Sequence, residues 1–197
     1  AYLLRRTYRV QPGDAVLIHA AAGGVGLIAC QWAKALGATV IGTVSTEEKA
    51  EQARRHGCDH VIFYTREEVA KRVRELTGGE GVAVAYDGVG KDTFMASIDS
   101  LRVRGMMVSF GNASGPVPAF EPLLLSQKGS LFFTRPILAH HTAKRDELLD
   151  LGGELFELVL SGKVKIEVNQ RYALADAVQA HCDLEARKTI GSTILVP

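Results

Sequence analysis

Residues 15–26 read AVLIHAAAGGVG, and this stretch decides the fold. Ala15–His19 is a short apolar run that follows the turn at residues 11–14, so we predict a buried strand. A glycine-rich turn comes next, and a helical pattern continues from it to Ala35, where Gly37 is placed to end the helix. A strand, a glycine-rich turn and a helix in this order indicate the first unit of an α/β fold.

Strand-like and helical segments alternate regularly beyond this unit. The further predicted strands are Ala38–Val44, Asp59–Phe63, Val82–Tyr86, Gly105–Phe110 and Gly129–Arg135. The predicted helices between them are one that Ser45 opens and Gly57 ends, then Arg66–Leu76 and Asp92–Ser100. Such alternation predicts a parallel sheet that is covered on both faces. Right-handed crossovers favour the doubly wound strand order 3-2-1-4-5-6 of the Rossmann fold.

The last third of the chain is less regular. The patterns there predict a helix at Ala143–Leu160, a strand at Val164–Tyr172, a helix at Leu174–Glu185 and a final strand at Ser192–Val196. Gly162 ends the first of these helices. We therefore expect an α/β domain at residues 1–162 and a C-terminal extension at residues 163–197.

The glycine-rich turn matches a degenerate dinucleotide-binding fingerprint. Ala21 replaces the first glycine, and Gly23 and Gly26 fill the other two positions. Gly23 would let the backbone approach a diphosphate closely, while Gly26 would let the helix pack against the strand. The amides at the helix N-terminus favour the phosphates. A tight turn without a ligand and a turn that binds S-adenosylmethionine are the alternatives.

The end of the second predicted strand favours NADP(H) over NAD(H). Residues 42–46 contain no carboxylate, although an NAD-binding domain usually has one there for the ribose 2′-hydroxyl. Ser45 is a candidate contact, and Lys49 lies one turn into the helix, where it can pair with a 2′-phosphate. Tyr64, at the end of the third strand, can flank the adenosine. Ser45 and Glu48, three residues apart, also predict a capping box that opens the helix. Alternatively, Lys49 pairs with nearby glutamates and Tyr64 is a half-buried strand-end residue.

Several segments together resemble one enzyme family. They are residues 20–26 (AAAGGVG), 86–90 (YDGVG), 104–112 (RGMMVSFGN), 127–136 (QKGSLFFTRP) and 187–197 (RKTIGSTILVP). In this order they are similar to the zeta-crystallin-like quinone oxidoreductases, a zinc-free branch of the medium-chain dehydrogenases. The family has a GroES-like catalytic domain before the nucleotide-binding part, and that domain is absent from this chain. The resemblance implies that residues 163–197 return toward the catalytic domain.

The resemblance also implies roles for individual residues. The 2′-phosphate would be met by Lys49, Tyr64 and Arg187. The diphosphate turn would consist of Ala22, Gly23, Gly24 and Val25. The wall beside the nicotinamide would comprise Val89, Phe110, Gly111 and Asn112, with Phe133 and Thr134 on the strand whose backbone meets the carboxamide. Taken singly, Phe110 and Phe133 are also explained as core aromatics and Arg187 as a helix C-terminal cap. No catalytic residue is assigned.

The expected function is hydride transfer from NADPH to a quinone or a similar electron-poor acceptor. The alternative is a non-enzymatic nucleotide-binding or structural protein, as the crystallin relatives suggest. The predicted edge strand at Leu131–Thr134 favours a homodimer, in which pairing across a two-fold axis would cover the edge. An edge that is covered by the protein's own loop is the other possibility.

Composition argues against several other classes of function. The net charge of +1 provides no field for nucleic acid, and no run approaches the ~20 apolar residues of a membrane span. The three cysteines are widely spaced, which favours a reducing, cytoplasmic location. His56, Cys58 and His60 superficially resemble a metal cluster, but alternating residues at a helix-to-strand corner point to opposite faces. We therefore expect no metal site.

Overall fold

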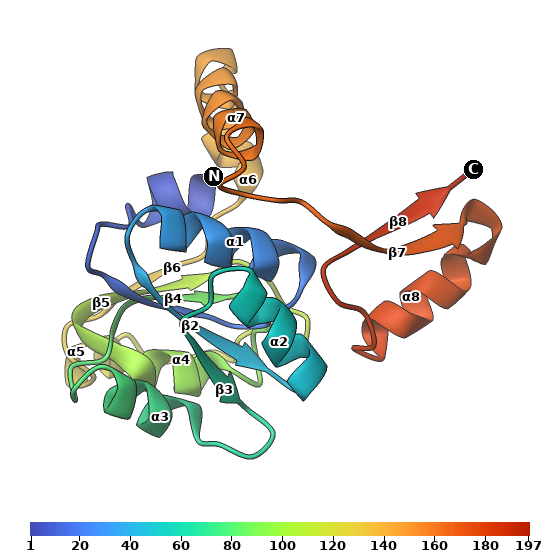
Figure 1. The fold of residues 1–197 in the computed structure, drawn as a ribbon. Helices are drawn as coiled ribbons and strands as arrows, with labels where there is room; N and C mark the ends of the chain where they lie inside the picture. The colour runs from blue at the N-terminus through green and yellow to red at the C-terminus, as the bar shows by residue number, and fades with distance from the viewer.

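A computed structural model describes all of residues 1–197 and contains a central parallel sheet with helices on both faces (Figure 1). The strand order is β3-β2-β1-β4-β5-β6. The strands are β1 (Ala15–Ile18), β2 (Thr39–Val44), β3 (His60–Phe63), β4 (Val82–Asp87), β5 (Leu101–Ser109) and β6 (Phe132–Thr134). This order confirms the predicted doubly wound topology.

The helices divide between the two faces of the sheet according to the core that they cover. The helices are η1 (Leu3–Thr7), α1 (Gly24–Ala35), α2 (Glu47–Arg55), α3 (Val69–Leu76), α4 (Phe94–Ser100), α5 (Leu123–Gln127), α6 (Leu138–His141) and α7 (Arg145–Leu160). The first core cluster joins η1, α1 and α2 to the sheet, and the second joins α3 and α4 to the opposite face. None of the helices is both long enough and apolar enough to cross a membrane.

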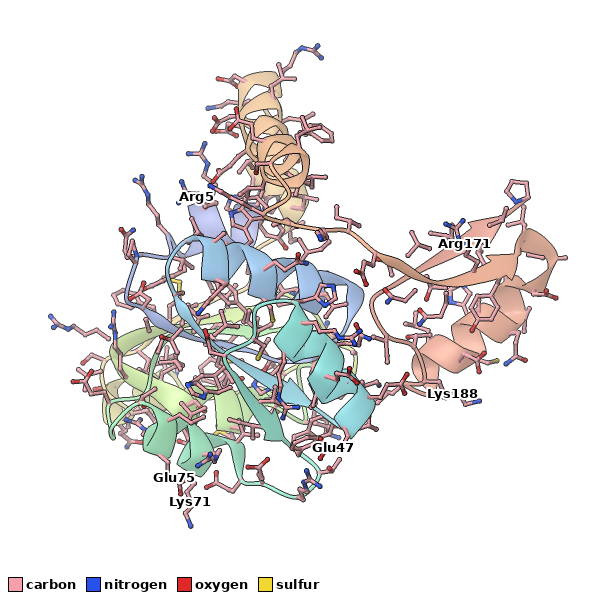
Figure 2. The ribbon with its side chains drawn as sticks, viewed as in Figure 1. Arg5, Glu47, Lys71, Glu75, Arg171 and Lys188 are labelled. Atoms are coloured by element: carbon pink, nitrogen blue, oxygen red, sulfur yellow. The ribbon has the colours of Figure 1, made fainter.

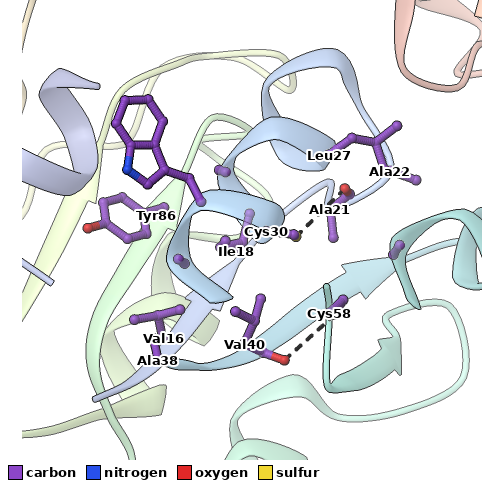
Figure 3. Packing of buried hydrophobic residues seen from close by; sticks show 14 of the residues in the cluster. Val16, Ile18, Ala21, Ala22, Leu27, Cys30, Ala38, Val40, Cys58 and Tyr86 are labelled. Carbon is purple, nitrogen blue, oxygen red and sulfur yellow. Dashed lines mark hydrogen bonds between the residues drawn. The ribbon is translucent and has the colours of Figure 1, made fainter. Parts of the chain in front are cut away.

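Successive side chains along a strand point to opposite faces of the sheet, so one strand can contribute residues to both core clusters. Val16 and Ile18 belong to the cluster under α1, which Figure 3 shows, whereas Leu17 between them belongs to the cluster under α3 and α4. On α3 the apolar Val73 is fully buried, and Lys71 points away from the sheet into solvent (Figure 2). The pattern that predicted a sheet with two covered faces is thus explained by two separate apolar layers.

The starts of α2 and α3 differ from the sequence predictions. Thr46, not Ser45, caps α2, because its hydroxyl accepts a hydrogen bond from the Lys49 amide at 3.3 Å. The capping box predicted for Ser45 is therefore wrong. Helix α3 begins at Val69 rather than Arg66, since the Glu68 carboxylate accepts from the Lys71 amide.

Further boundaries shift in the same way. Helix α4 begins at Phe94 rather than Asp92, and β5 extends back to Leu101. His140 and His141 lie in the short helix α6, which the sequence patterns did not predict. The strand predicted at Val164–Tyr172 begins four residues later, because Val164 is fully buried in the first core cluster.

The C-terminal segment forms a separate unit beside the main sheet. It consists of β7 (Val168–Ala173), η2 (Leu174–Asp176), α8 (Ala177–Glu185) and β8 (Ser192–Val196), with β7 and β8 paired in parallel. In Figure 1 this unit projects to the side of α2, joined to the rest by two extended segments. The returning segment touches the glycine-rich turn, where the Gly191 amide donates to the Ala22 carbonyl at 2.8 Å.

Candidate cofactor-binding site

The glycine-rich turn after β1 ends in a helix without an N-terminal side-chain cap. Gly23 is the N-cap residue of α1, no side chain accepts from the first-turn amides, and the first turn contains no acidic residue. The first amides of a helix have no partner within the helix, so an N-terminus of this kind can bind an anion. Helix α2, in contrast, has Thr46 as a cap and two acids in its first turn.

Glycine is required at position 26 by the close approach of the turn. A Cβ atom on Gly26 would lie 2.3 Å from the carbonyl oxygen of Ala20. Ala20 itself has φ 52°, a left-handed conformation that is uncommon for alanine. Its carbonyl also accepts from the Gly23 amide at 2.9 Å. The predicted packing role of Gly26 is confirmed, and the turn is held by a carbonyl that the sequence pattern did not single out.

A cavity of about 460 Å³ lies between this turn and the carboxyl ends of β2 and β4. The predicted residues that line it are Ala22, Gly23, Ser45, Lys49, Tyr64, Val89 and Arg187. Lining residues that sequence reasoning missed are Ala20, Thr43, Val44, Val69, Asp92, Thr93, Ala96, Ala113 and Thr189. The cavity therefore lies where the topology of a doubly wound sheet places a nucleotide.

Two basic side chains from distant parts of the chain meet at this cavity. The Lys49 ammonium donates a hydrogen bond to the carbonyl of Arg187, a residue 138 positions away. The Arg187 guanidinium lies 3.9 Å from Asp92, which is on the loop after β4. The alternative for Lys49, an ion pair with a nearby glutamate, does not occur.

The backbone of Arg187 acts as the C-terminal cap of a helix, as the alternative interpretation predicted. Arg187 follows α8 with φ 58°, and its amide donates to the Leu184 carbonyl, so the residue ends the helix. Its side chain nevertheless lines the cavity. Ending α8 in this way directs the following segment back toward the turn, where Gly23 and Gly191 form a bridge.

A second, more apolar cavity of about 390 Å³ adjoins the first across the turn. The two cavities share Ala20, Gly23, Val89 and Ala113. The second also contains the predicted residues Val25 and Phe110, together with Leu3, Trp32, Tyr86 and Leu155. One continuous surface around the glycine-rich turn thus offers a polar part and an apolar part.

Five predicted residues do not line either cavity: Gly24, Gly111, Asn112, Phe133 and Thr134. Gly24 is the first residue of α1, and Gly111 packs on Gly88, where a Cβ would lie 2.4 Å from the carbonyl oxygen. Phe133 packs against Phe94 and Phe120, as the core alternative predicts. Thr134 pairs with Val108 at the end of β6.

A buried carboxylate organises the loop after β4. Asp87 is fully buried and accepts from the amides of Val89 and Gly90, both at 2.9 Å. It also accepts from the hydroxyls of Thr93 and Ser97. Every oxygen of this carboxylate has donors, so its role is to hold the loop that borders both cavities.

Comparison with known proteins identifies the family. Residues 24–151 match the family described as zinc-binding dehydrogenase. The chain belongs to the zinc-binding dehydrogenase family. It is 57% identical over 198 residues to a quinone oxidoreductase of Salmonella typhimurium, covering all of this chain and 61% of that protein. It is 51% identical over 199 residues to a 2-haloacrylate reductase of a Burkholderia species, covering 100% of this chain and 59% of that protein.

A solved structure of another relative has the same fold. The Escherichia coli quinone oxidoreductase, crystallised in complex with NADPH, superposes with a TM-score of 0.96 at 52% identity. The match covers 100% of this chain and 61% of that one. The chain thus spans about 60% of the length of the relatives that it matches.

Potential metal ligands of this chain do not converge. No group of three or more histidine, cysteine, aspartate or glutamate side chains is arranged to hold a metal ion. Cys30 and Cys58 are buried, Cys182 is exposed, and all three are free thiols. Cys30 belongs to the first core cluster.

Proposed function

We propose that this chain is the NADP(H)-binding part of an oxidoreductase that transfers hydride from NADPH to a quinone or a similarly electron-poor acceptor. The observation that carries the proposal is the meeting of Lys49 and Arg187 beside the uncapped N-terminus of α1. This arrangement places two cations on the wall of the first cavity, close to a helix N-terminus that has no side-chain cap. Both are features that a phosphorylated dinucleotide requires.

Each part of the cofactor has a place in this proposal. The diphosphate would accept hydrogen bonds from the amides of Gly24 and Val25, with Ala22 and Gly23 close to it. The 2′-phosphate would lie between Lys49 and Arg187, with Ser45 and Tyr64 at the adenosine.

The nicotinamide end would occupy the second, apolar cavity. Val89 and Phe110 would form its wall, with Gly111 and Asn112 behind them, and the backbone of residues 133–134 would meet the carboxamide. When bound, the nicotinamide supplies the hydride. The apolar side chains around it orient the ring and exclude water.

The acceptor class follows from the relatives. A quinone and a 2-haloacrylate both contain an electron-poor double bond that is conjugated to a carbonyl or carboxyl group, so one hydride donor can serve either. We propose an acceptor of this class. A turnover assay with the complete protein separates this proposal from a purely structural role, since a structural protein would bind NADPH without oxidising it.

The organisation of the whole protein is also a proposal. We infer an α/β domain at residues 1–162, an extension at 163–197 that returns toward a catalytic domain of the GroES type, and no zinc. Phe132, which is 56% exposed on the edge strand β6, supports a homodimer through that edge. Three free cysteines support a cytoplasmic location.

Calorimetry with NADPH and NADH tests the cofactor assignment. We expect the chain to prefer NADPH, and Lys49→Ala to weaken NADPH binding about tenfold or more, because a charge-assisted contact to phosphate is lost. NADH binding should change little, since NADH has no 2′-phosphate. Lys71→Ala, on the solvent face of α3, is the matched control and should leave both affinities unchanged. An unchanged NADPH/NADH preference in Lys49→Ala would show that the 2′-phosphate site is wrong.

A further inference from the structure

We propose that His19 is a positioning residue of the cofactor site, whose buried ring locks the glycine-rich turn to the loop after β4. The proposal rests on the function proposed above. It assigns a task to a buried histidine that binding of NADPH by the turn, Lys49 and Arg187 does not use.

The His19 ring lies between three elements and borders the second cavity, while its partner Thr43 lines the first. It directly follows β1, is 3% exposed, and has its Nδ1 atom 3.1 Å from the hydroxyl of Thr43 on β2. Its Nε2 atom is 3.0 Å from the hydroxyl of Ser97 on α4. Ser97 in turn donates to Asp87 at 2.7 Å, and the Ala20 amide donates to Thr43 at 3.3 Å. These five residues form one continuous chain of hydrogen bonds.

The direction of this chain assigns the ring tautomer. A carboxylate only accepts, so the Ser97 proton is donated to Asp87 and the Ser97 oxygen must accept from the Nε2–H of His19. The unprotonated Nδ1 then accepts from the Thr43 hydroxyl, whose oxygen accepts from the Ala20 amide. Every donor is used once, and the bonds all run from the turn to Asp87. A neutral ring with its proton on Nε2 is the only state that satisfies all of them.

The charges around the ring are consistent with this state. Burial lowers the pKa of His19 below its ordinary value, and the nearby Asp87 carboxylate offsets this effect only in part. The elements that face the ring nitrogens, β2 and α4, offer hydroxyls and no further charge. A second proton on the ring would leave the Thr43 hydroxyl without its acceptor.

Both ends of the chain of hydrogen bonds act on segments that border the cavities. At one end, the bond to Thr43 holds Ala20 in its left-handed conformation, and the Ala20 carbonyl fixes the Gly23 amide. At the other end, Asp87 holds the amide of Val89, which lines both cavities. The ring therefore sets the spacing between the two walls that a bound diphosphate and nicotinamide would touch.

Ser97→Ala is the sharpest test, because Ser97 is fully buried and lines neither cavity. Ser100→Ala is a matched control: Ser100 lies on the same helix, is also fully buried, and donates only to the Ala96 carbonyl. We expect NADPH binding to the 197-residue chain to weaken about tenfold in Ser97→Ala and to remain unchanged in Ser100→Ala. Ser97→Thr, which keeps the hydroxyl, should restore part of the affinity.

Two further readouts separate positioning from a general loss of stability. Nitrogen NMR of the His19 ring should show a single Nε2-protonated tautomer in the wild type and a mixture in Ser97→Ala. Hydrogen exchange of the Ala20 and Gly23 amides should accelerate in Ser97→Ala and not in Ser100→Ala.

The outcomes distinguish this inference from the proposed function. If the wild type binds NADPH and Ser97→Ala binds it as tightly as Ser100→Ala does, the positioning role is wrong and the cofactor site stands. If the wild type does not bind NADPH, the proposed function is wrong. In that case, equal exchange rates of the Ala20 and Gly23 amides in Ser97→Ala and Ser100→Ala would also show that His19 does not hold the turn to the loop after β4.

Discussion

Ala20 and Gly26 meet at the tightest point of the turn. The Ala20 carbonyl occupies the space that a side chain at position 26 would need, and the same carbonyl accepts from Gly23. The fingerprint glycine at position 26 is therefore a packing requirement of the backbone. The diphosphate-binding geometry depends on it only through the position of α1.

Gly26→Ala should consequently reduce both stability and cofactor binding. The added Cβ would lie 2.3 Å from a backbone oxygen, so α1 must move, at a cost of about 1–3 kcal/mol in the free energy of unfolding. Gly153→Ala on α7 is the control, since a Cβ there meets nothing within 4 Å. That control should stabilise the protein by about 0.5–1 kcal/mol. Urea denaturation measures the free energy of unfolding of both variants. Equal changes in Gly26→Ala and Gly153→Ala would contradict the steric explanation.

Residue-scale patterns predicted part of the site and missed another part. The glycine spacing and the missing carboxylate at residues 42–46 were sufficient to identify the turn and Lys49. Nothing in the local pattern pointed to Thr43 or Ser97, because their partner His19 is 24 and 78 positions away in sequence. A buried hydrogen-bonded chain of this kind becomes visible only when the strands are placed side by side.

At the scale of elements, hydrophobic runs located every strand of the main sheet, while side-chain caps decided where helices begin. Thr46 and Glu68 cap α2 and α3, and each can do so only from the backbone conformation that the preceding strand and turn impose. The short helices α5 and α6 were not predicted, since four or five residues show no helical period.

The corrected cap of α2 gives a prediction at this scale. Thr46→Ala should lower the free energy of unfolding by about 1 kcal/mol, because the Lys49 amide loses its acceptor. Ser45→Ala should leave stability nearly unchanged, as Ser45 makes no capping bond. Thermal denaturation of the two variants distinguishes them. A larger loss in Ser45→Ala than in Thr46→Ala would restore the capping box predicted from the sequence.

At the scale of the whole molecule, the candidate site depends on contact between residues 22–49 and residues 187–191, which are far apart in sequence. Lys49 follows β2, whereas Arg187 belongs to the segment that connects α8 to β8 and returns to the turn. Periodicity predicted the sheet order, but it gave no information on where residues 163–197 would lie. Only the family resemblance pointed to Arg187, which lines the first cavity, and its ion-pair partner Asp92 was missed.

A crystal structure of the chain with NADPH tests the central claim most directly. The account predicts diphosphate oxygens within hydrogen-bonding distance of the Gly24 and Val25 amides. It also predicts the 2′-phosphate between the side chains of Lys49 and Arg187. Adenosine bound away from the cavity beside β2, or a 2′-phosphate that contacts neither cation, would contradict it.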